Sequence, residues 1–167
     1  MCANILISPL THADIPYIVE IEKQSQPEPW SSQSFMEELS RLHSHLLVAK
    51  LAEEGADPNT CPPYPPGGIV GYICYWSVAD EIQILNIAVH KDFRRKSIGS
   101  RLLSDAIRTG REKNAGVVTL EVRKSNTPAR ILYESLGFRA VGERPNYYGA
   151  HGEAAVLMEL EINLEKG

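Results

Sequence analysis

The spacing of apolar positions at the start of the chain predicts a strand followed by two helices. Ile5 and Ile7 are alternate positions ahead of a Ser-Pro turn signal, which predicts a strand. Asp14 can cap a helix that carries Pro16 in its first turn and runs to about Glu22. A Pro-Glu-Pro stretch interrupts this helix, and a serine then caps a short second helix that reaches Leu39.

Three apolar runs that follow have the length and composition of strands. They cover Leu46–Leu51, Ile69–Val78 and Ile82–Val89, and the last two are joined by a hairpin-like link. Residues 53–68 contain five prolines and three glycines, which predicts a long surface loop without regular structure. A proline-rich ligand for a partner is the alternative. Because the strands on each side are too short to stand alone, we interpret residues 1–167 as one domain.

An apolar stripe with helical spacing follows the third of these runs. Its positions are Gly99, Leu102, Leu103, Ala106, Ile107 and Gly110. The β-branched run Val117–Val122 then predicts a central strand, so this part of the chain has the order of a β-α-β crossover.

The last third of the chain predicts one more helix and a closing hairpin. Asn126 or Thr127 caps the helix, and Gly137 ends it as a left-handed residue. Strands follow from about Val141 and over Ala154–Ile162. The order β-α-α-β-β-β-α-β-α-β-β predicts an α/β (mixed α+β) fold, with about seven strands in a mixed, mostly antiparallel sheet and helices on both faces.

Composition and charge exclude several classes of function. The net charge of −4 argues against a nucleic-acid-binding protein, and no apolar run approaches the roughly 20 residues of a membrane span. The N-terminus lacks the pattern of a signal peptide. Cys2, Cys61 and Cys74 are an odd number at wide spacing with no nearby histidine set, so neither disulfides nor a metal site is indicated. We expect reduced thiols in a cytoplasmic protein.

A basic stretch at the start of the apolar stripe predicts an anion site. Arg94, Arg95 and Lys96 directly precede Ser97 and Gly99, where the helix begins. The first amides of a helix have no internal partner, and its dipole is positive at that end. These features suit a pyrophosphate; a cationic loop on a solvated helix start is the alternative. GxxxxGK[ST] and GxGxxG are absent, which excludes a P-loop and a dinucleotide fingerprint.

Three blocks of sequence carry a resemblance to a known family. They are NIAVHKDFRRKSIGSRLL over 86–103, LEVRKSNTPARILYESLGF over 120–138 and RPNYY over 144–148. Together they resemble the GCN5-related N-acetyltransferases, and among them the bacterial ribosomal-protein-alanine N-acetyltransferases of the RimI type. The resemblance implies acetyl-CoA as cosubstrate, no metal, and an acceptor that is the α-amine of a protein N-terminus, such as an alanine of a small-subunit ribosomal protein.

The same resemblance implies roles for individual residues. Strand alternation places Val118, Leu120 and Val122 on one face and Glu121 on the other. Glu121 corresponds to the family's proposed base, and Tyr133 to the acid that protonates the departing thiolate, in a direct ternary-complex mechanism. The alternatives from the residues alone are a solvent-facing glutamate and a tyrosine at the edge of the core.

Further positions match cofactor and acceptor contacts of the family. The implied cofactor positions are Ile87, Ala88, Val89, Arg94, Arg95, Lys96, Ser97, Ile98, Gly99, Ser100, Asn126 and Tyr133. Ser97 replaces the family's first motif glycine, and its Cβ disfavours a positive φ. Trp30, Tyr147 and Tyr148 are the implied acceptor-binding residues, the two tyrosines in the final hairpin connection. An acetyltransferase for lysine or a small amine, and a non-catalytic acyl-CoA-binding module, remain alternatives.

Overall fold

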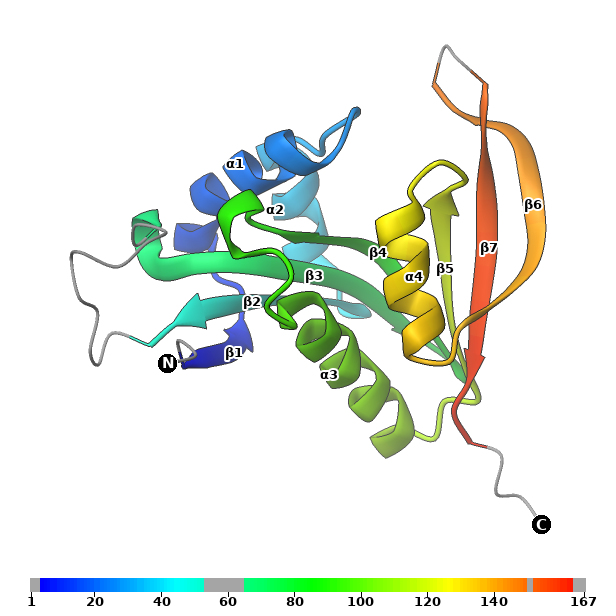
Figure 1. The fold of residues 1–167 in the computed structure, drawn as a ribbon. Helices are drawn as coiled ribbons and strands as arrows, with labels where there is room; N and C mark the ends of the chain where they lie inside the picture. The colour runs from blue at the N-terminus through cyan, green and yellow to red at the C-terminus, as the bar shows by residue number, and fades with distance from the viewer. Residues whose placement is uncertain (1–3, 53–64, 150–151, 164–167) are drawn as a thin grey trace. The chain divides into compact units, whose positions relative to one another are not determined.

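A computed structural model describes residues 4–52, 65–149 and 152–163 (Figure 1). The strands are β1 Ile5–Pro9, β2 Ser44–Leu51, β3 Ile69–Val78, β4 Glu81–Val89, β5 Val117–Arg123, β6 Arg139–Tyr148 and β7 Glu153–Glu161. The α-helices are α1 Ile15–Ser25, α2 Ser32–Ser40, α3 Ile98–Glu112 and α4 Thr127–Ser135. This order of strands and α-helices is the predicted one.

The strands form a seven-stranded sheet with the order β1-β2-β3-β4-β5-β7-β6. Strands β4 and β5 are parallel, with Glu81 opposite Val117 and Ile84 opposite Leu120, and α3 is the crossover between them. Strand β7 is antiparallel to both β5 and β6. The predicted mixed, mostly antiparallel sheet with one β-α-β crossover is therefore confirmed.

The chain divides into two compact units. Unit 1 comprises Met1–Cys74 and Asn86–Leu102, and unit 2 comprises Tyr75–Leu85 and Leu103–Gly167. Strands β3 and β4 and helix α3 each pass from one unit into the other. The predicted anion site falls in unit 1, and the predicted acid and base fall in unit 2.

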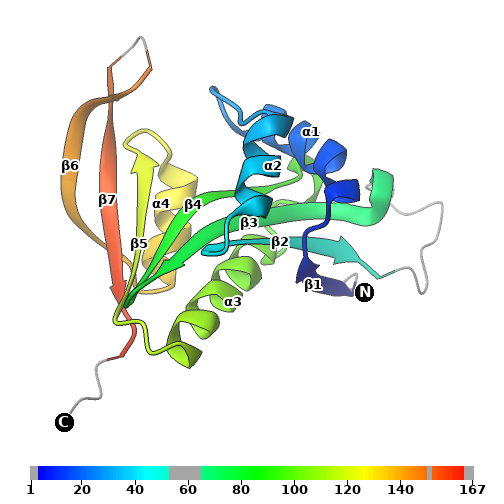
Figure 2. The same cartoon turned by 180° about the vertical axis from the view of Figure 1, so that it is seen from behind.

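Helices cover both faces of the strands of unit 1 (Figures 1 and 2). Successive residues of a strand point to opposite faces. The ring of Tyr72 on β3 meets Phe35 of α2 edge-on, with ring centroids 5.4 Å apart. The preceding residue, Gly71, faces Ile98 and Leu102 in the first turn of α3. Helix α2 and the start of α3 therefore pack on opposite faces of β3.

The apolar stripe of α3 is buried as predicted. Leu103, Ala106 and Ile107 are buried in unit 2. A Cβ added to Gly110 would lie 2.9 Å from Ile82 of β4 and 2.8 Å from Ile162, so the helix backbone packs closely there. This contact anchors the crossover helix to the strand that precedes it.

Helix α4 begins and ends where its local signals predict. The Asn126 side-chain oxygen accepts a hydrogen bond from the amide of Ala129 at 3.3 Å, which caps the first turn. Gly137 has a φ of 97°, and the Phe138 amide returns to the carbonyl of Tyr133 at 3.1 Å. This is the glycine C-cap that the sequence predicts, and it holds Tyr133 in the last turn.

Some boundaries differ from the prediction. Helix α1 continues to Ser25, beyond the expected end near Glu22, and β6 begins at Arg139 instead of Val141. Residues 66–68, expected to be irregular, form a short 3-10 turn. Cys2, Cys61 and residues 53–64 of the predicted loop lie outside the described residues. None of the helices in the described part of the chain is long and apolar enough to cross a membrane.

Cys74 is a free, buried thiol on β3. Burial raises the pKa of this thiol to about 12, against the smaller opposing effect of a hydrogen bond with Ser44. The thiol therefore stays protonated at neutral pH, which makes a nucleophilic role at this position unfavourable.

Candidate active site

The basic stretch before α3 adopts a backbone conformation that suits an anion. Arg95 and Ser97 have φ angles of 63° and 61°, in the left-handed region that L residues with a Cβ rarely adopt. Helix α3 starts at Ile98, and its first intrahelical bond joins the Arg101 amide to the Ser97 carbonyl at 3.0 Å. The amides that begin the helix have no acceptor within it, so they can donate to an anionic group such as a pyrophosphate.

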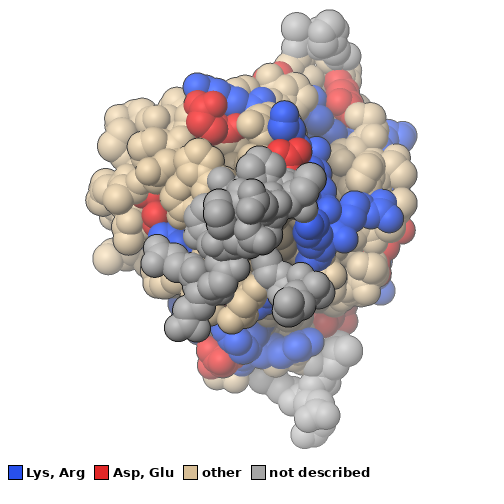
Figure 3. All heavy atoms as spheres, turned by 60° about the vertical axis from the view of Figure 1, so that its left-hand side comes forward, with Lys and Arg blue, Asp and Glu red and all other residues tan. Residues whose placement is uncertain are grey.

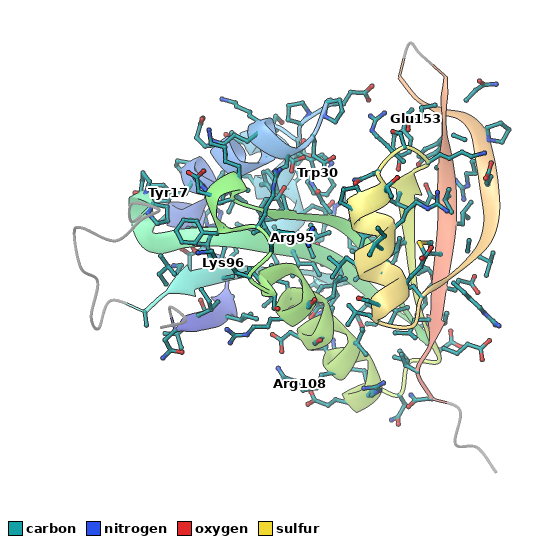
Figure 4. All side chains as sticks on the ribbon, viewed as in Figure 1. Tyr17, Trp30, Arg95, Lys96, Arg108 and Glu153 are labelled. Atoms are coloured by element: carbon teal, nitrogen blue, oxygen red, sulfur yellow. The ribbon has the colours of Figure 1, made fainter. Side chains whose placement is uncertain are left out.

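The basic side chains of this stretch differ in their surroundings: one bonds within the protein and two are exposed. The Arg94 guanidinium donates to the Val89 carbonyl at 3.2 Å and to the Ser25 hydroxyl at 3.3 Å, so it fastens the end of β4 to α1. Arg95 and Lys96 are exposed, and Figure 4 shows them on the segment just before α3. Lys and Arg side chains gather in a band on one face of the molecule (Figure 3), although the net charge is −4.

The predicted cofactor segment of β4 precedes this stretch in the same unit. Ala88 is buried and Ile87 and Val89 are half-buried. The amide of His90 donates to the carbonyl of Val70 on β3 at 2.8 Å, which keeps the end of β4 paired with β3. Ile98, Gly99 and Ser100, also predicted for the cofactor, lie in the first turn of α3; Ile98 is buried, and Gly99 and Ser100 are half-buried.

Glu121 lies on β5 in unit 2 on the face opposite to the buried Val118, Leu120 and Val122, as predicted. Its side chain is 22% exposed and forms an ion pair with the Arg144 guanidinium of β6 at 3.3 Å. The charge of the Glu121 carboxylate raises the pKa of nearby Tyr147. The carboxylate is thus paired with one cation and lies near one phenol.

Tyr133 is 7% exposed in the last turn of α4, with its ring 5.9 Å from that of Phe138. Burial raises the Tyr133 pKa to about 12, and nearby Tyr148 contributes to the same shift. The hydroxyl is therefore a stable proton donor throughout the neutral range.

Tyr148 connects these groups. Its ring lies under the Arg123 guanidinium, 4.2 Å from the ring centroid, and is perpendicular to Tyr147 at a centroid distance of 5.0 Å. Burial raises the Tyr148 pKa to about 12, and the charges of Glu121 and Tyr147 add to this shift. Glu121, Arg144, Tyr147 and Tyr148 therefore form one cluster in unit 2, and Tyr148 also affects the pKa of the buried Tyr133.

The prediction that Tyr147 and Tyr148 lie in the hairpin connection is wrong. Both belong to β6, and Tyr148 is paired with Glu153 of β7. Between Arg144 and Tyr148, four steps along β6 oppose only two along β7, so two extra residues bulge from the strand. A bulge turns side chains away from the regular alternation, which is how consecutive tyrosines reach the same cluster.

Two further predicted residues have structural partners. The Asn126 side chain caps α4, and Trp30 is half-buried with its ring 5.4 Å from that of Phe35. Arg144 and Arg123 belong to the unit 2 cluster, and both fall in the blocks that carry the family resemblance. The sequence predicts no role for them, because strand register brings them beside Glu121 and Tyr148. No group of three or more potential metal ligands occurs within the described residues.

Comparisons with known proteins identify the family to which the chain is similar. Residues 15–138 match the acetyltransferase (GNAT) family. A Bacillus subtilis protein provisionally named a ribosomal protein bS18-alanine N-acetyltransferase is 37% identical over 151 residues, covering 90% of this chain and 91% of that protein. The Escherichia coli ribosomal protein bS18-alanine N-acetyltransferase is 32% identical over 160 residues, covering 95% and 98%. The crystal structure of the Escherichia coli ribosomal-protein-S18-alanine N-acetyltransferase superimposes with a TM-score of 0.78 at 31% identity, covering 95% of this chain and 94% of that one.

Proposed function

Because the chain belongs to the acetyltransferase (GNAT) family, we propose that it transfers the acetyl group of acetyl-CoA to the α-amine of a protein N-terminus. The names of its bacterial relatives support an alanine at the N-terminus of ribosomal protein bS18 as the acceptor. With such an acceptor, we propose that the enzyme acts in the cytoplasm. We further propose that residues 1–167 act as one domain.

One observation carries the proposal: unit 2 holds an ion-paired carboxylate that raises the pKa of Tyr148, and a buried phenol whose pKa Tyr148 raises in turn. Glu121 takes a proton from the α-amine, through a water molecule, as the nitrogen attacks the thioester carbonyl carbon. Tyr133 gives its hydroxyl proton to the sulfur as the carbon–sulfur bond breaks. The products are an N-acetylated terminus and the free thiol, and solvent returns the proton from Glu121 to Tyr133.

The choice of acceptor follows from amine basicity. An α-amine has a pKa near ~7.7–8.0, whereas a lysine amine has one of about 10.4. A carboxylate base can deprotonate the first at neutral pH far more readily than the second. Tyr147 and Tyr148, beside the base, suit contacts with the first residues of an extended peptide, and Trp30 is the proposed contact from unit 1.

The residues of unit 1 fit acetyl-CoA. The free amides at the start of α3, with Arg95 and Lys96 beside them, suit its pyrophosphate, and the Ile87–Val89 backbone suits the amides of its pantetheine arm. The cosubstrate supplies an activated acetyl group as a thioester. Asn126, at the head of α4 in unit 2, is proposed as a further contact.

Mass spectrometry of three acceptors tests the proposal. The first is a peptide with the N-terminal sequence of bS18, the second is the same peptide with a blocked α-amine and an added lysine, and the third is a polyamine. We expect one acetyl group on the first peptide, located at the α-amine, and none on the others. Acetylation of lysine or polyamine would instead assign a different acceptor class. Acetyl-CoA binding without any transfer would favour a non-catalytic module.

A further inference from the structure

Glu22 is a fully buried carboxylate that the proposed chemistry does not use. It lies in the last part of α1 in unit 1 and is 0% exposed. Its Oε1 accepts hydrogen bonds from the Trp30 amide at 3.0 Å and from the Asn86 side-chain amide at 2.9 Å. Its Oε2 accepts from the Tyr72 hydroxyl. A buried carboxylate is tolerated only when it is well hydrogen-bonded, and these three donors provide the bonds.

The donors come from three separate segments. Trp30 belongs to the loop Gln26–Ser31 between α1 and α2, Tyr72 to β3 and Asn86 to β4. All three partners are neutral, so the carboxylate organises polar groups without neutralising a cation. A hydrogen bond in such a buried network is worth more than an exposed one, because the alternative is an unsatisfied polar group.

Trp30 is held at both ends by the same set of residues. Its amide is bonded to Glu22, and its ring packs on Phe35 at a centroid distance of 5.4 Å. Phe35 in turn contacts the ring of Tyr72, whose hydroxyl returns to Glu22. Phe35 and Tyr72 are fully buried, so the Trp30 ring cannot shift on that side without moving the core.

The loop is also tied to the proposed cofactor strand. Asn86 directly precedes the Ile87–Val89 segment, and its side-chain oxygen accepts from the Gln26 side chain at 3.4 Å. Both ends of the loop, Gln26 and Trp30, are thus linked to β4 through Asn86, directly or by way of Glu22. Trp30 remains half-buried, and Figure 4 shows it on the loop after α1, so part of its surface is available to a ligand.

We propose that Glu22 is a positioning residue of the acceptor site, which holds Trp30 and its loop at a fixed place on the cofactor strand. This inference rests on the proposed function, because Trp30 is an acceptor contact only if a peptide terminus is the acceptor. Glu22 itself contacts no substrate, since its carboxylate is buried and all three of its donors belong to the protein.

The kinetic test removes the carboxylate and compares a matched control. Glu22→Ala is expected to raise the acceptor-peptide KM about tenfold and to leave the acetyl-CoA KM within about twofold, because the β4 backbone keeps its pairing with β3. Glu38→Ala is the control, since it removes another buried carboxylate of unit 1, bonded to Ser44 and Arg41 instead of the loop. Equal acceptor KM values for the two variants would overturn the proposal.

A conservative variant separates hydrogen bonding from bulk. In Glu22→Gln the side-chain oxygen can still accept from Trp30 and Asn86, and the new amide can donate to the Tyr72 hydroxyl. We expect its acceptor KM to lie within about threefold of the wild type. If Glu22→Gln were as impaired as Glu22→Ala, the loop would not be held by these bonds and the proposal would be wrong.

A fluorescence measurement tests positioning without acetyl transfer. The chain has two tryptophans, Trp30 and Trp76, so in a Trp76→Phe background the emission reports Trp30 alone. Acrylamide quenching of Trp30 is expected to increase at least about twofold with Glu22→Ala and to stay unchanged with Glu38→Ala. If Glu22→Ala does not fold, Tyr72→Phe takes its place, because this change removes one donor to Glu22 and keeps the ring. We expect Tyr72→Phe to increase the acrylamide quenching of Trp30 as well.

The test of the proposed function and the test of Glu22 can be distinguished from each other. If the wild type acetylates none of the acceptors, the proposed function is wrong, while the quenching data still decide whether Glu22 fixes Trp30. If the peptide is acetylated but quenching and acceptor KM follow the Glu38→Ala control, the function stands and Glu22 has no positioning role.

Discussion

Gly71 is a position where one added methyl group should disturb both stability and cofactor binding. A Cβ at this site would lie 3.0 Å from the Ala88 carbonyl oxygen, and 3.3 and 3.4 Å from side-chain atoms of Ile98 and Leu102. The nearest atom is backbone, which cannot rotate away as a side chain could. Gly71→Ala must therefore move β3 from β4 and from the start of α3 by a few tenths of an ångström.

The size of the effect follows from two opposing contributions. Forcing an extra methyl group into a packed site costs about 1–3 kcal/mol. Replacing glycine by alanine returns about 0.4–1 kcal/mol, because alanine has less conformational freedom in the unfolded chain. We expect a net loss of about 1–1.5 kcal/mol, which lowers the Tm of a chain of this length by about 2–6 °C. Since Ile98 begins the proposed cradle, its displacement should also weaken acetyl-CoA binding, by about fivefold.

Gly142→Ala is the matched control, because Gly142 is also a strand glycine. Its Cβ would meet only a Leu157 side-chain atom, at 4.0 Å, so alanine should be neutral or slightly stabilising there. Urea unfolding followed by circular dichroism measures stability, and calorimetry measures the acetyl-CoA Kd. If Gly71→Ala were as stable as Gly142→Ala and bound acetyl-CoA with the wild-type Kd, the steric argument would be refuted.

Four further predictions concern the site and its ionisation. Glu121→Gln should lower kcat/KM about 100-fold at pH 7 and less at pH 9, because an α-amine with a pKa near ~7.7–8.0 is already neutral there; a loss that does not change with pH would contradict the base role. Tyr133→Phe should lower kcat at least about 100-fold with little change in acetyl-CoA KM. Since the Tyr133 pKa is about 12, deprotonation of this group should cause no decline in the wild-type rate below pH ~10. Ser97→Gly removes the strain of a φ of 61°, which stabilises the folded state by about 1 kcal/mol. Glycine also gives the unfolded chain more conformational freedom, which costs a similar amount, so the free energy of unfolding should change by less than ~0.5 kcal/mol. Calorimetry should give an acetyl-CoA Kd that is unchanged or lower. Burial raises the Glu22 pKa above 4.5, so the folded state binds the proton more tightly than the unfolded state; the unfolding free energy of the wild type relative to Glu22→Gln should therefore fall as pH rises from about 4.5 through the folded pKa.

Elements with local signals were predictable from the sequence. The stripe of α3 and the glycine that ends α4 depend on residues within a few positions of each other, and both are present in the structure. The placements of the proposed base and acid were also predictable: Glu121 lies on the less buried face of β5, as strand alternation indicates, and Tyr133 is a residue of α4.

The role of Glu22 was not predicted, although a signal for it exists. Ile15, Ile18 and Val19 form the buried stripe of α1, and Glu22 continues it at the next helical position. A carboxylate on an apolar stripe indicates a buried polar network, because an unpartnered charge could not be accommodated there. Its partners could not be named in advance, since Trp30, Tyr72 and Asn86 are 8, 50 and 64 positions away in the sequence.

The surroundings of Glu121 depend on register, and register is a property of three strands at once. Arg123 of β5 is opposite Ala155 of β7, which is opposite Arg144 of β6, so these residues form one row across the sheet. Neighbouring strands lie ≈ 4.7–4.9 Å apart, so β6 and β5 are separated by about 9.5 Å. Only a long side chain that crosses the small Ala155 can span that gap.

The adjacent row leaves Arg144 free to make this crossing. Glu121 is opposite Leu157, which is opposite Gly142, so β6 contributes no side chain to the Glu121 row. Arg144 can therefore reach over Ala155 to the carboxylate, at the observed 3.3 Å. Shifting β6 by one residue would turn Arg144 to the other face of the sheet and break the pair. The bulges that fix this register thus determine which cation accompanies the base, and nothing in the local sequence around Glu121 specifies it.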